Sequence, residues 1–366
     1  MLIEPEITTD FLLESTIFYG AEGNPLLAPR GVWMHAGKLF VADTGQNRVF
    51  IWNKMPTSSH QIPDVTLGQV EATDTKRNSG QTVSGSTLHY PSGLWSDGIR
   101  LIIADAWNHR VLIWHSFPTK NGQAADVVIG QPQFNVNQPN VTGVGSNPSA
   151  RSLNWPYGVF SNGEQLWIAD TGNRRVLFYK NIPEENYQEA HDVIGKAHFE
   201  ERDYEHKDPI WPYSVKISKE GAMAITDTQY YRVLLWQDWR SSFKQKADVI
   251  IGQENFEGNG QNQYRLQPAA FTLNWCYDSF FHQDTLYVAD TGNSRILRFS
   301  PIPLKNNPSA HSLIGHDDFG TGSENAKTMM GTSNALYWPF SICIENDLLA
   351  IADTGNHRVI LKRINS

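Results

Sequence analysis

The stretch LFVADTGQNRVFIW, residues 39–52, holds an apolar run closed by an aspartate, a short polar turn, and an arginine that opens a second apolar run. The pattern returns five more times, as LIIADAWNHRVLIW (101–114), LWIADTGNRRVLFY (166–179), MAITDTQYYRVLLW (223–236), LYVADTGNSRILRF (286–299) and LAIADTGNHRVILK (349–362). Recurrence at a near-constant period indicates a repeat architecture. We therefore interpret the chain as six copies of one structural unit.

Each unit has room for four short strands and one long loop. The first strand follows a proline, as in Pro91-Ser-Gly-Leu-Trp95, and the two halves of the repeated phrase are the second and third strands. The fourth is a short run ending in glycine, found at Asp64–Gly68, Asp126–Gly130, Asp192–Gly195, Asp248–Gly252 and Ser312–Gly315. The middle strands are almost continuously apolar, which favours sheets covered on both faces. Neighbouring blades of a propeller cover one another in this way.

The fourth-strand pattern occurs only five times inside the array, and the sixth third strand lies close to Ser366. A matching sixth run, STIFYG, lies near the other terminus at residues 15–20. We expect this segment to form the outer strand of the last blade, closing the ring without an exposed edge. The prediction is an all-β fold: a six-bladed β-propeller with four antiparallel strands per blade, its last blade closed by an N-terminal outer strand. Residues 1–366 are expected to form one domain.

The phrase Ala-Asp-Thr-Gly-Asn-x-Arg-Val after a Pro-x-Gly strand resembles the NHL repeat, and the resemblance covers nearly the whole chain from about Thr16 onward. It implies a six-bladed β-propeller. Proteins of that family include lyases, hydrolases, RNA-binding modules and interaction platforms. The resemblance therefore implies the fold, and the function has to be argued from the site.

Composition excludes several classes of protein. Thirty basic against 38 acidic residues give a net charge of −8, a poor match to nucleic acid, whose binding depends on neutralising phosphates. The opening MLIEPEITTDFLLES lacks the basic start and apolar core of a secretory signal, and no stretch is long enough to span a bilayer. We predict a soluble, cytoplasmic protein with no membrane or nucleic-acid partner. Cys276 and Cys343 are expected to be buried free thiols.

The sixfold-repeated polar residues are expected to serve the sixfold-repeated scaffold. Each repeated arginine lies five residues after its turn aspartate, so we predict local pairing across the turn. The arginines are Arg48, Arg110, Arg175, Arg232, Arg295 and Arg358.

Strand direction places the starts of the first strands, the turns between second and third strands, and the loops between blades on one face of the disc, here called the long-loop face. Its loops span roughly 70–88, 132–153, 197–210, 254–273 and 317–336, well beyond hairpin lengths. Long loops on one side of a rigid array are either functional or decorative.

Aromatic residues flank the prolines that open the first strands. The residues immediately before the proline position, which holds Cys276 in the fifth unit, are Tyr90, Trp155, Trp211, Trp275 and Trp338, with Ala28 as the exception. Because the four tryptophans recur in register, we expect them to wedge between blades as core. The residues after the proline position vary in type, and we expect them to line the mouth of the central channel and carry recognition: Arg30, Ser92, Tyr157, Tyr213, Tyr277 and Phe340.

Two further departures from the repeat fall near that mouth. Trp107 and Tyr230 replace the usual turn residues and should place aromatic rings on the long-loop face, either for function or as tolerated drift. Asp278, with Lys216 and Arg30 elsewhere on the ring, is either a functional charged group or part of a salt bridge that plugs the channel.

Enzymatic alternatives can be tested against the resemblance. Its zinc lyases imply Pro-His at the start of first strands, which is absent here, and its calcium-dependent propellers need more channel oxygens than Asp278, Asn154 and Asn274 supply. We therefore predict no metal and no cofactor. A metal-independent hydrolase or lyase stays open as the alternative, with Asp278 as base, a tyrosine as acid and Arg30 binding an anion. An RNA-binding module ranks third.

We predict a binding module that recognises a partner protein or a small ring-bearing molecule on the long-loop face. The candidate ligand- or partner-binding residues are Arg30, Trp107, Tyr157, Tyr213, Tyr230, Tyr277, Asp278 and Phe340.

Overall fold

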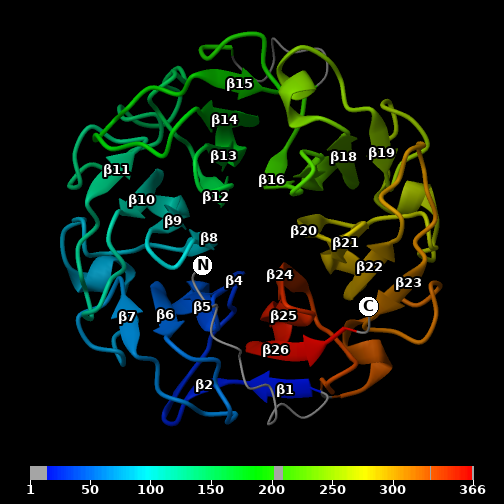
Figure 1. The fold of residues 1–366 in the computed structure, drawn as a ribbon, viewed down its shortest axis with the longest axis horizontal. Coiled ribbons are helices and arrows are strands. Elements are labelled where there is room, and N and C mark those ends of the chain that lie inside the picture. The colour runs from blue at the N-terminus through cyan, green and yellow to red at the C-terminus, as the bar shows by residue number, and fades with distance from the viewer. Residues whose placement is uncertain (1–14, 202–208, 330, 365–366) are drawn as a thin grey trace, which may run out of the picture.

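Six four-stranded antiparallel sheets form a ring in the computed structural model, which describes residues 15–201, 209–329 and 331–364 (Figure 1). Each sheet runs from an inner strand beside the central axis to an outer strand at the rim. The prediction of an all-β, six-bladed propeller is confirmed.

The inner and second strands of each blade follow the sequence pattern closely. The inner strands are β4 (Gly31–His35), β8 (Pro91–Ser96), β12 (Pro156–Ser161), β16 (Pro212–Ile217), β20 (Cys276–His282) and β24 (Pro339–Glu345). The second strands are β5 (Lys38–Asp43), β9 (Leu101–Asp105), β13 (Leu166–Asp170), β17 (Met223–Asp227), β21 (Thr285–Asp290) and β25 (Leu348–Asp353). The second strands are buried almost throughout because neighbouring blades cover both of their faces.

The third and fourth strands complete each blade. The third strands are β6 (Arg48–Trp52), β10 (Arg110–Trp114), β14 (Arg175–Tyr179), β18 (Arg232–Trp236), β22 (Arg295–Phe299) and β26 (Arg358–Arg363). The fourth strands of the first five blades are β7 (Val65–Leu67), β11 (Val127–Ile129), β15 (Asp192–Ile194), β19 (Val249–Ile251) and β23 (Ser312–Ile314). All five runs that the sequence marks as fourth strands are therefore strands.

The last blade is closed by the N-terminal segment, as predicted. Strand β1 (Ser15–Phe18) pairs antiparallel with β26, with Phe18 opposite Val359. Phe18 is fully buried and meets the ring of Trp52 edge-on at 4.6 Å between centroids. A short hairpin of β2 (Gly20–Ala21) and β3 (Asn24–Pro25) then leads into the first blade.

Short 3₁₀ turns join the second and third strands: η1 (Thr44–Gln46), η3 (Ala106–Asn108), η4 (Thr171–Asn173), η6 (Thr228–Tyr230), η9 (Thr291–Asn293) and η11 (Thr354–Asn356). Further 3₁₀ segments lie in the connections: η2 (Arg77–Gly80), η7 (Trp239–Phe243), η8 (Gln261–Tyr264) and η10 (Glu324–Lys327).

The repeated aspartate and arginine form a buried ion pair across each of these turns. In blade one, Arg48 Nε donates to Asp43 Oδ2 at 2.7 Å, and the other carboxylate oxygen accepts the N–H of Leu27 at 2.7 Å. The second blade repeats this arrangement with Arg110 and Asp105 at 2.7 Å. The same pairing occurs in the other four blades, which confirms the scaffold role predicted for these residues.

The core runs between the blades and contains both cysteines. Cys276 and Cys343 are buried free thiols, as predicted. Burial raises the pKa of both thiols, so neither is a reactive thiolate at neutral pH. Within the described part of the chain, no helix combines the length and apolar character needed to cross a membrane.

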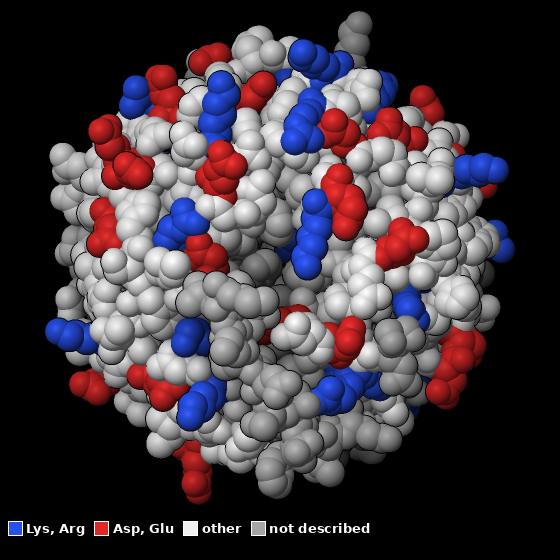
Figure 2. All heavy atoms as spheres, viewed as in Figure 1, with Lys and Arg blue, Asp and Glu red and all other residues white. Residues whose placement is uncertain are grey.

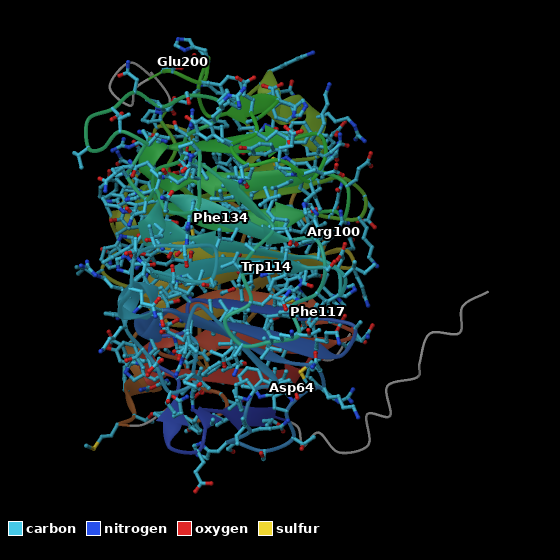
Figure 3. All side chains as sticks on the ribbon, turned by 90° about the vertical axis from the view of Figure 1, so that its left-hand side faces the viewer. Asp64, Arg100, Trp114, Phe117, Phe134 and Glu200 are labelled. Atoms are coloured by element: carbon cyan, nitrogen blue, oxygen red, sulfur yellow. The ribbon has the colours of Figure 1, made fainter. Side chains whose placement is uncertain are left out.

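The two faces of the disc carry different connections. Figure 3 shows Glu200, in the loop after β15, on one side and Arg100, in the turn between β8 and β9, on the other. Figure 2 views the face on the Arg100 side, where Lys and Arg side chains mix with Asp and Glu without a patch of one sign. The candidate site lies on the opposite, long-loop face.

Candidate functional site

A shift in strand register aims the residues after the prolines into the channel mouth. In blades three and four, the pairing of the inner strand with its neighbour skips Tyr157 and Tyr213. Blades five and six skip Tyr277 and Phe340 at the same point. A β-bulge frees a residue from the ladder and turns its side chain in a new direction. The repeat therefore delivers an aromatic side chain to the channel mouth from each of these four blades.

These four aromatic rings pack against one another in a continuous layer. Tyr157 stacks on Tyr213 at 4.6 Å between ring centroids, and Tyr277 stacks on Phe340 at 4.1 Å. Tyr213 meets Tyr277 edge-on at 4.5 Å, which joins the two pairs. Tyr213 is buried, whereas Tyr157 and Tyr277 are half-buried. The layer is the closed floor of the channel mouth, here called the aromatic floor.

Arg30 and Trp107 complete this floor on the side of the first two blades. The Arg30 guanidinium lies 4.1 Å from the ring centroid of Phe340 and 5.1 Å from that of Tyr90. Trp107 stacks on Tyr90 at 4.5 Å, and its indole N–H donates to the Tyr157 hydroxyl at 3.2 Å. The turn residue Trp107 therefore reaches the channel mouth, as the prediction required.

Charged side chains lie directly below the floor. Lys216 Nζ donates to Asp278 Oδ1 at 2.7 Å in a buried pair. The other carboxylate oxygen of Asp278 accepts the Ser341 hydroxyl at 2.9 Å and the N–H of Ile342 at 3.1 Å. Of the two interpretations of Asp278, a functional charged group or a salt bridge in the channel, this geometry fits the salt bridge. Arg30 takes no part in that pair.

The inner strands leave little free space in the channel below the floor. At Gly31, an added Cβ would lie 1.9 Å from the carbonyl oxygen of Ser92, so the inner strands pack at backbone contact there. The cavity under the floor measures about 20 Å³, close to the space that one water occupies. Further along the axis, Trp33 packs against Phe160 and Phe280 at 6.5 and 6.0 Å. A ligand at the channel mouth must therefore bind above the floor.

Three of the four tryptophans at the position before the inner strands lie on the surface, so the prediction that they wedge between blades as core is wrong for these three. Trp155, Trp275 and Trp338 expose 45%, 43% and 41% of their surface, and Trp107 exposes 44%. Trp211 is half-buried. These five side chains, Trp107 at the edge of the floor and four at the starts of inner strands, are here called the tryptophan ring.

Backbone conformation explains this exposure. Trp155, Trp275 and Trp338 have φ of 48°, 47° and 51°, in the left-handed region that bulky residues rarely adopt. The preceding blade holds this geometry in place, because the N–H of Trp155 donates to His109 Nδ1 at 3.1 Å. The His109 ring also stacks against Trp155 at 5.9 Å. The Trp155 indole therefore rests one side on the turn of the preceding blade, as Trp275 does on Tyr231 at 6.4 Å, and each is partly exposed to solvent.

Tyr230 lies apart from the floor. Its ring packs 4.9 Å from the guanidinium carbon of Arg232 in its own blade, where four other blades carry an asparagine. The structure thus places seven of the eight candidate residues at or just below the channel mouth and leaves Tyr230 at a blade turn.

The long loops carry a second repeat that the sequence interpretation missed. Each begins with a glycine, which glutamine follows in three of the five loops. Four of the five carry a phenylalanine at the fifth position, as in Gly130–Phe134 and Gly252–Phe256. Gln131 Nε2 donates to the carbonyls of His109 and Gln138 at 3.0 and 2.8 Å, and Arg110 donates to the carbonyl of Phe134. The period of these Gly-Gln pairs was the signal that could have revealed the loops as anchored scaffold.

The hydroxyls of the floor remain protonated at neutral pH. Burial raises the pKa of Tyr157 and Tyr277, and it raises the pKa of Tyr213 well above its ordinary value although Arg30 acts in the opposite direction. The three phenols are therefore hydrogen-bond donors and weak acids. Among residues 15–201, 209–329 and 331–364, no three His, Cys, Asp or Glu side chains gather as a metal-ligand set.

Comparison with known proteins identifies the fold class. Hydrazine synthase of Kuenenia stuttgartiensis is similar over 93% of this chain and 96% of that chain, with a TM-score of 0.52 and 10% identity. A streptogramin B lyase matches with a TM-score of 0.47 and 11% identity, over 96% of this chain and 97% of that chain. The glutaminyl cyclase of Myxococcus xanthus matches with a TM-score of 0.42 and 12% identity, over the same shares of the two chains. No protein-family model and no curated protein matches the sequence. The likeness to the first of these structures extends to the β-propeller fold and no further.

Proposed function

We propose that residues 1–366 form a single NHL-type propeller that acts in the cytoplasm as a binding module. Its long-loop face recognises a partner protein or a small ring-bearing molecule. The observation that carries this proposal is the tryptophan ring, which exposes four indoles by 41–45% each around a closed aromatic floor. Exposed aromatic side chains grouped on one face are typical of interaction surfaces, where Trp, Tyr and Arg supply most of the binding energy.

Two observations favour this function over the hydrolase or lyase alternative. The carboxylate of Asp278, the base of that alternative, accepts hydrogen bonds from Lys216, Ser341 and two backbone N–H groups, which leaves it poorly placed to take a proton from a substrate. The cavity beside it holds about 20 Å³, far below the roughly 300 Å³ of a small-molecule pocket.

The test is a pair of substitutions on the exposed ring. A partner or ligand is first captured with the wild-type protein and purified, and its affinity for each variant is then measured. The double variant Trp155→Ala with Trp275→Ala should bind it about thirtyfold more weakly or worse. Its thermal unfolding should be nearly unchanged. The matched control is Ile99→Ala with Leu304→Ala, since these side chains are 67% and 75% exposed in connections of the opposite face. If the control variant loses binding and the tryptophan variant keeps it, the recognition face is misassigned.

A further inference from the structure

Arg30 differs from the six repeated arginines in having no carboxylate partner. Each repeated arginine donates to the aspartate of its own turn at 2.7 or 2.8 Å. Across the described ranges, no ion pair includes Arg30. The nearest carboxylate along the channel, Asp278, is already neutralised by Lys216. A half-buried guanidinium held by aromatic faces and one phenol oxygen retains its charge and most of its donor capacity.

The phenol next to Arg30 also lacks an acceptor. The Tyr213 hydroxyl oxygen lies within hydrogen-bonding reach of the Arg30 guanidinium, but its proton finds no acceptor among the described residues. Tyr213 is more than nine-tenths buried. A guanidinium offers donors only, so it cannot accept the phenol proton. The Tyr157 hydroxyl is fixed by the indole N–H of Trp107, which directs the Tyr157 proton elsewhere. The channel mouth thus holds a cation for which the described residues supply no carboxylate acceptor.

The chemistry of the missing acceptor follows from the charge of the mouth. One guanidinium matches one monoanionic carboxylate, with which arginine makes short charge-assisted hydrogen bonds. A polyanion such as nucleic acid is disfavoured by the single cation in the floor and by the net charge of −8. Because the cavity below the floor holds only about 20 Å³, the carboxylate must arrive from above as part of a ligand spread over the surface.

We propose that Arg30 binds a carboxylate carried by a peptide segment of a partner protein, while the tryptophan ring packs against the apolar residues on either side of it. This inference rests on the proposed function and selects, from its two ligand classes, an acidic peptide flanked by apolar side chains.

An array of immobilised random dodecapeptides tests the inference, with affinities of the bound peptides measured by fluorescence polarisation. We expect the binders to carry an Asp, a Glu or a free C-terminus between apolar residues. Replacing that carboxylate by the amide should weaken binding about tenfold or more. Arg30→Gln should weaken binding of the acidic peptide by the same factor and leave the affinity for the amide peptide unchanged. Arg30→Lys should give an intermediate loss, because it keeps the charge and loses the planar fork.

The controls separate failure of this inference from failure of the proposed function. Trp155→Ala with Trp275→Ala should weaken acid and amide peptides equally, and Arg100→Gln on the opposite face should change neither. Thermal unfolding of every variant verifies that it is folded. Equal binding of acid and amide peptides, or a folded Arg30→Gln variant with unchanged affinity, overturns the carboxylate site and leaves the binding module standing. An RNA dodecamer that binds more tightly than every peptide also overturns the carboxylate site. If the wild-type protein binds no peptide saturably, the peptide-binding form of the proposed function is wrong as well.

Discussion

Two residues at the same repeat position show how a side chain can serve both the scaffold and the recognition face. Asn47 and His109 each occupy the left-handed residue that ends the turn of their blade, with φ of 56° and 53°. Each accepts the backbone N–H of the aromatic residue on the next blade: Asn47 Oδ1 from Tyr90 at 3.0 Å, and His109 Nδ1 from Trp155 at 3.1 Å. Of the two, only the histidine can titrate, so the hydrogen bond that holds the backbone of Trp155 is sensitive to pH.

Stability should fall in acid because of His109. Burial lowers its pKa from 6.5 to about 4, and a charged imidazole could no longer accept the N–H of Trp155. Between these values the unfolded chain binds more protons than the folded one, so the free energy of unfolding decreases as pH falls from 6.5 to 4. The loss should approach about 3 kcal/mol.

Urea unfolding at a series of pH values measures this loss, and His109→Asn is the matched variant. Asparagine tolerates the left-handed conformation and can accept the Trp155 N–H as Asn47 accepts that of Tyr90. The variant should keep the stability of the wild type at pH 7 and lose this part of the pH dependence. An unchanged pH profile in His109→Asn would show that other groups are responsible.

At the scale of elements, paired asparagines fasten the long loops to the blade turns. Asn140 in the loop before blade three and Asn173 in the turn of that blade exchange amide hydrogen bonds at 3.0 and 2.8 Å. Blades two, five and six repeat the pair with Asn78 and Asn108, Asn262 and Asn293, and Asn325 and Asn356. Because both members are largely buried, each amide would lose one of its hydrogen-bond partners, with little water to replace it, if the other were removed.

Replacing one asparagine should therefore lower the free energy of unfolding by more than half of the amount lost when both are replaced. Asn140→Ala and Asn173→Ala should each lower the free energy of unfolding by about 1–3 kcal/mol, and the double variant by less than their sum. Denaturant unfolding of the full cycle checks this, with the exposed Asn53→Ala expected to change stability by less than about 0.5 kcal/mol. Strict additivity would mean that the two amides do not support each other.

For the molecule as a whole, closure of the ring depends on a contact between the two ends of the chain. Strand β1 covers the outer edge of β26, and the neighbouring sheets form the rest of the circle (Figure 1). An uncovered edge strand offers unpaired N–H and C=O groups to other chains. The four residues of β1 therefore protect the last blade from edge-to-edge association.

Deletion of residues 1–22 should expose that edge, lower the melting temperature markedly and promote aggregation. Phe18→Ala isolates the packing part of this effect, because Phe18 is fully buried against Trp52, and should cost about 3–5 kcal/mol. Calorimetry and light scattering measure both variants. A truncated protein that melts like the full chain and stays monomeric would show that the ring does not need β1.

The sequence by itself determined the ring, its closure and its internal ion pairs. A local repeated pattern predicts these features. One hairpin forms wherever an apolar run is followed by an aspartate and, five residues later, by an arginine. The residues at the channel mouth could also be predicted as a set, since strand direction alone brings the starts of the inner strands together. The count of fourth-strand patterns sufficed to identify β1 as the missing strand.

Only the tertiary structure decided what those residues do at the mouth. Whether Trp155 is core or surface depends on a left-handed backbone supported by His109 of the preceding blade, a contact that no local pattern encodes. The pairing of Asp278 with Lys216, and not with Arg30, likewise depends on how six strands from distant parts of the chain fill one narrow axis. Steric packing of many side chains at once settles such choices, and it leaves Arg30 with an unmatched charge on the face that the tryptophans surround.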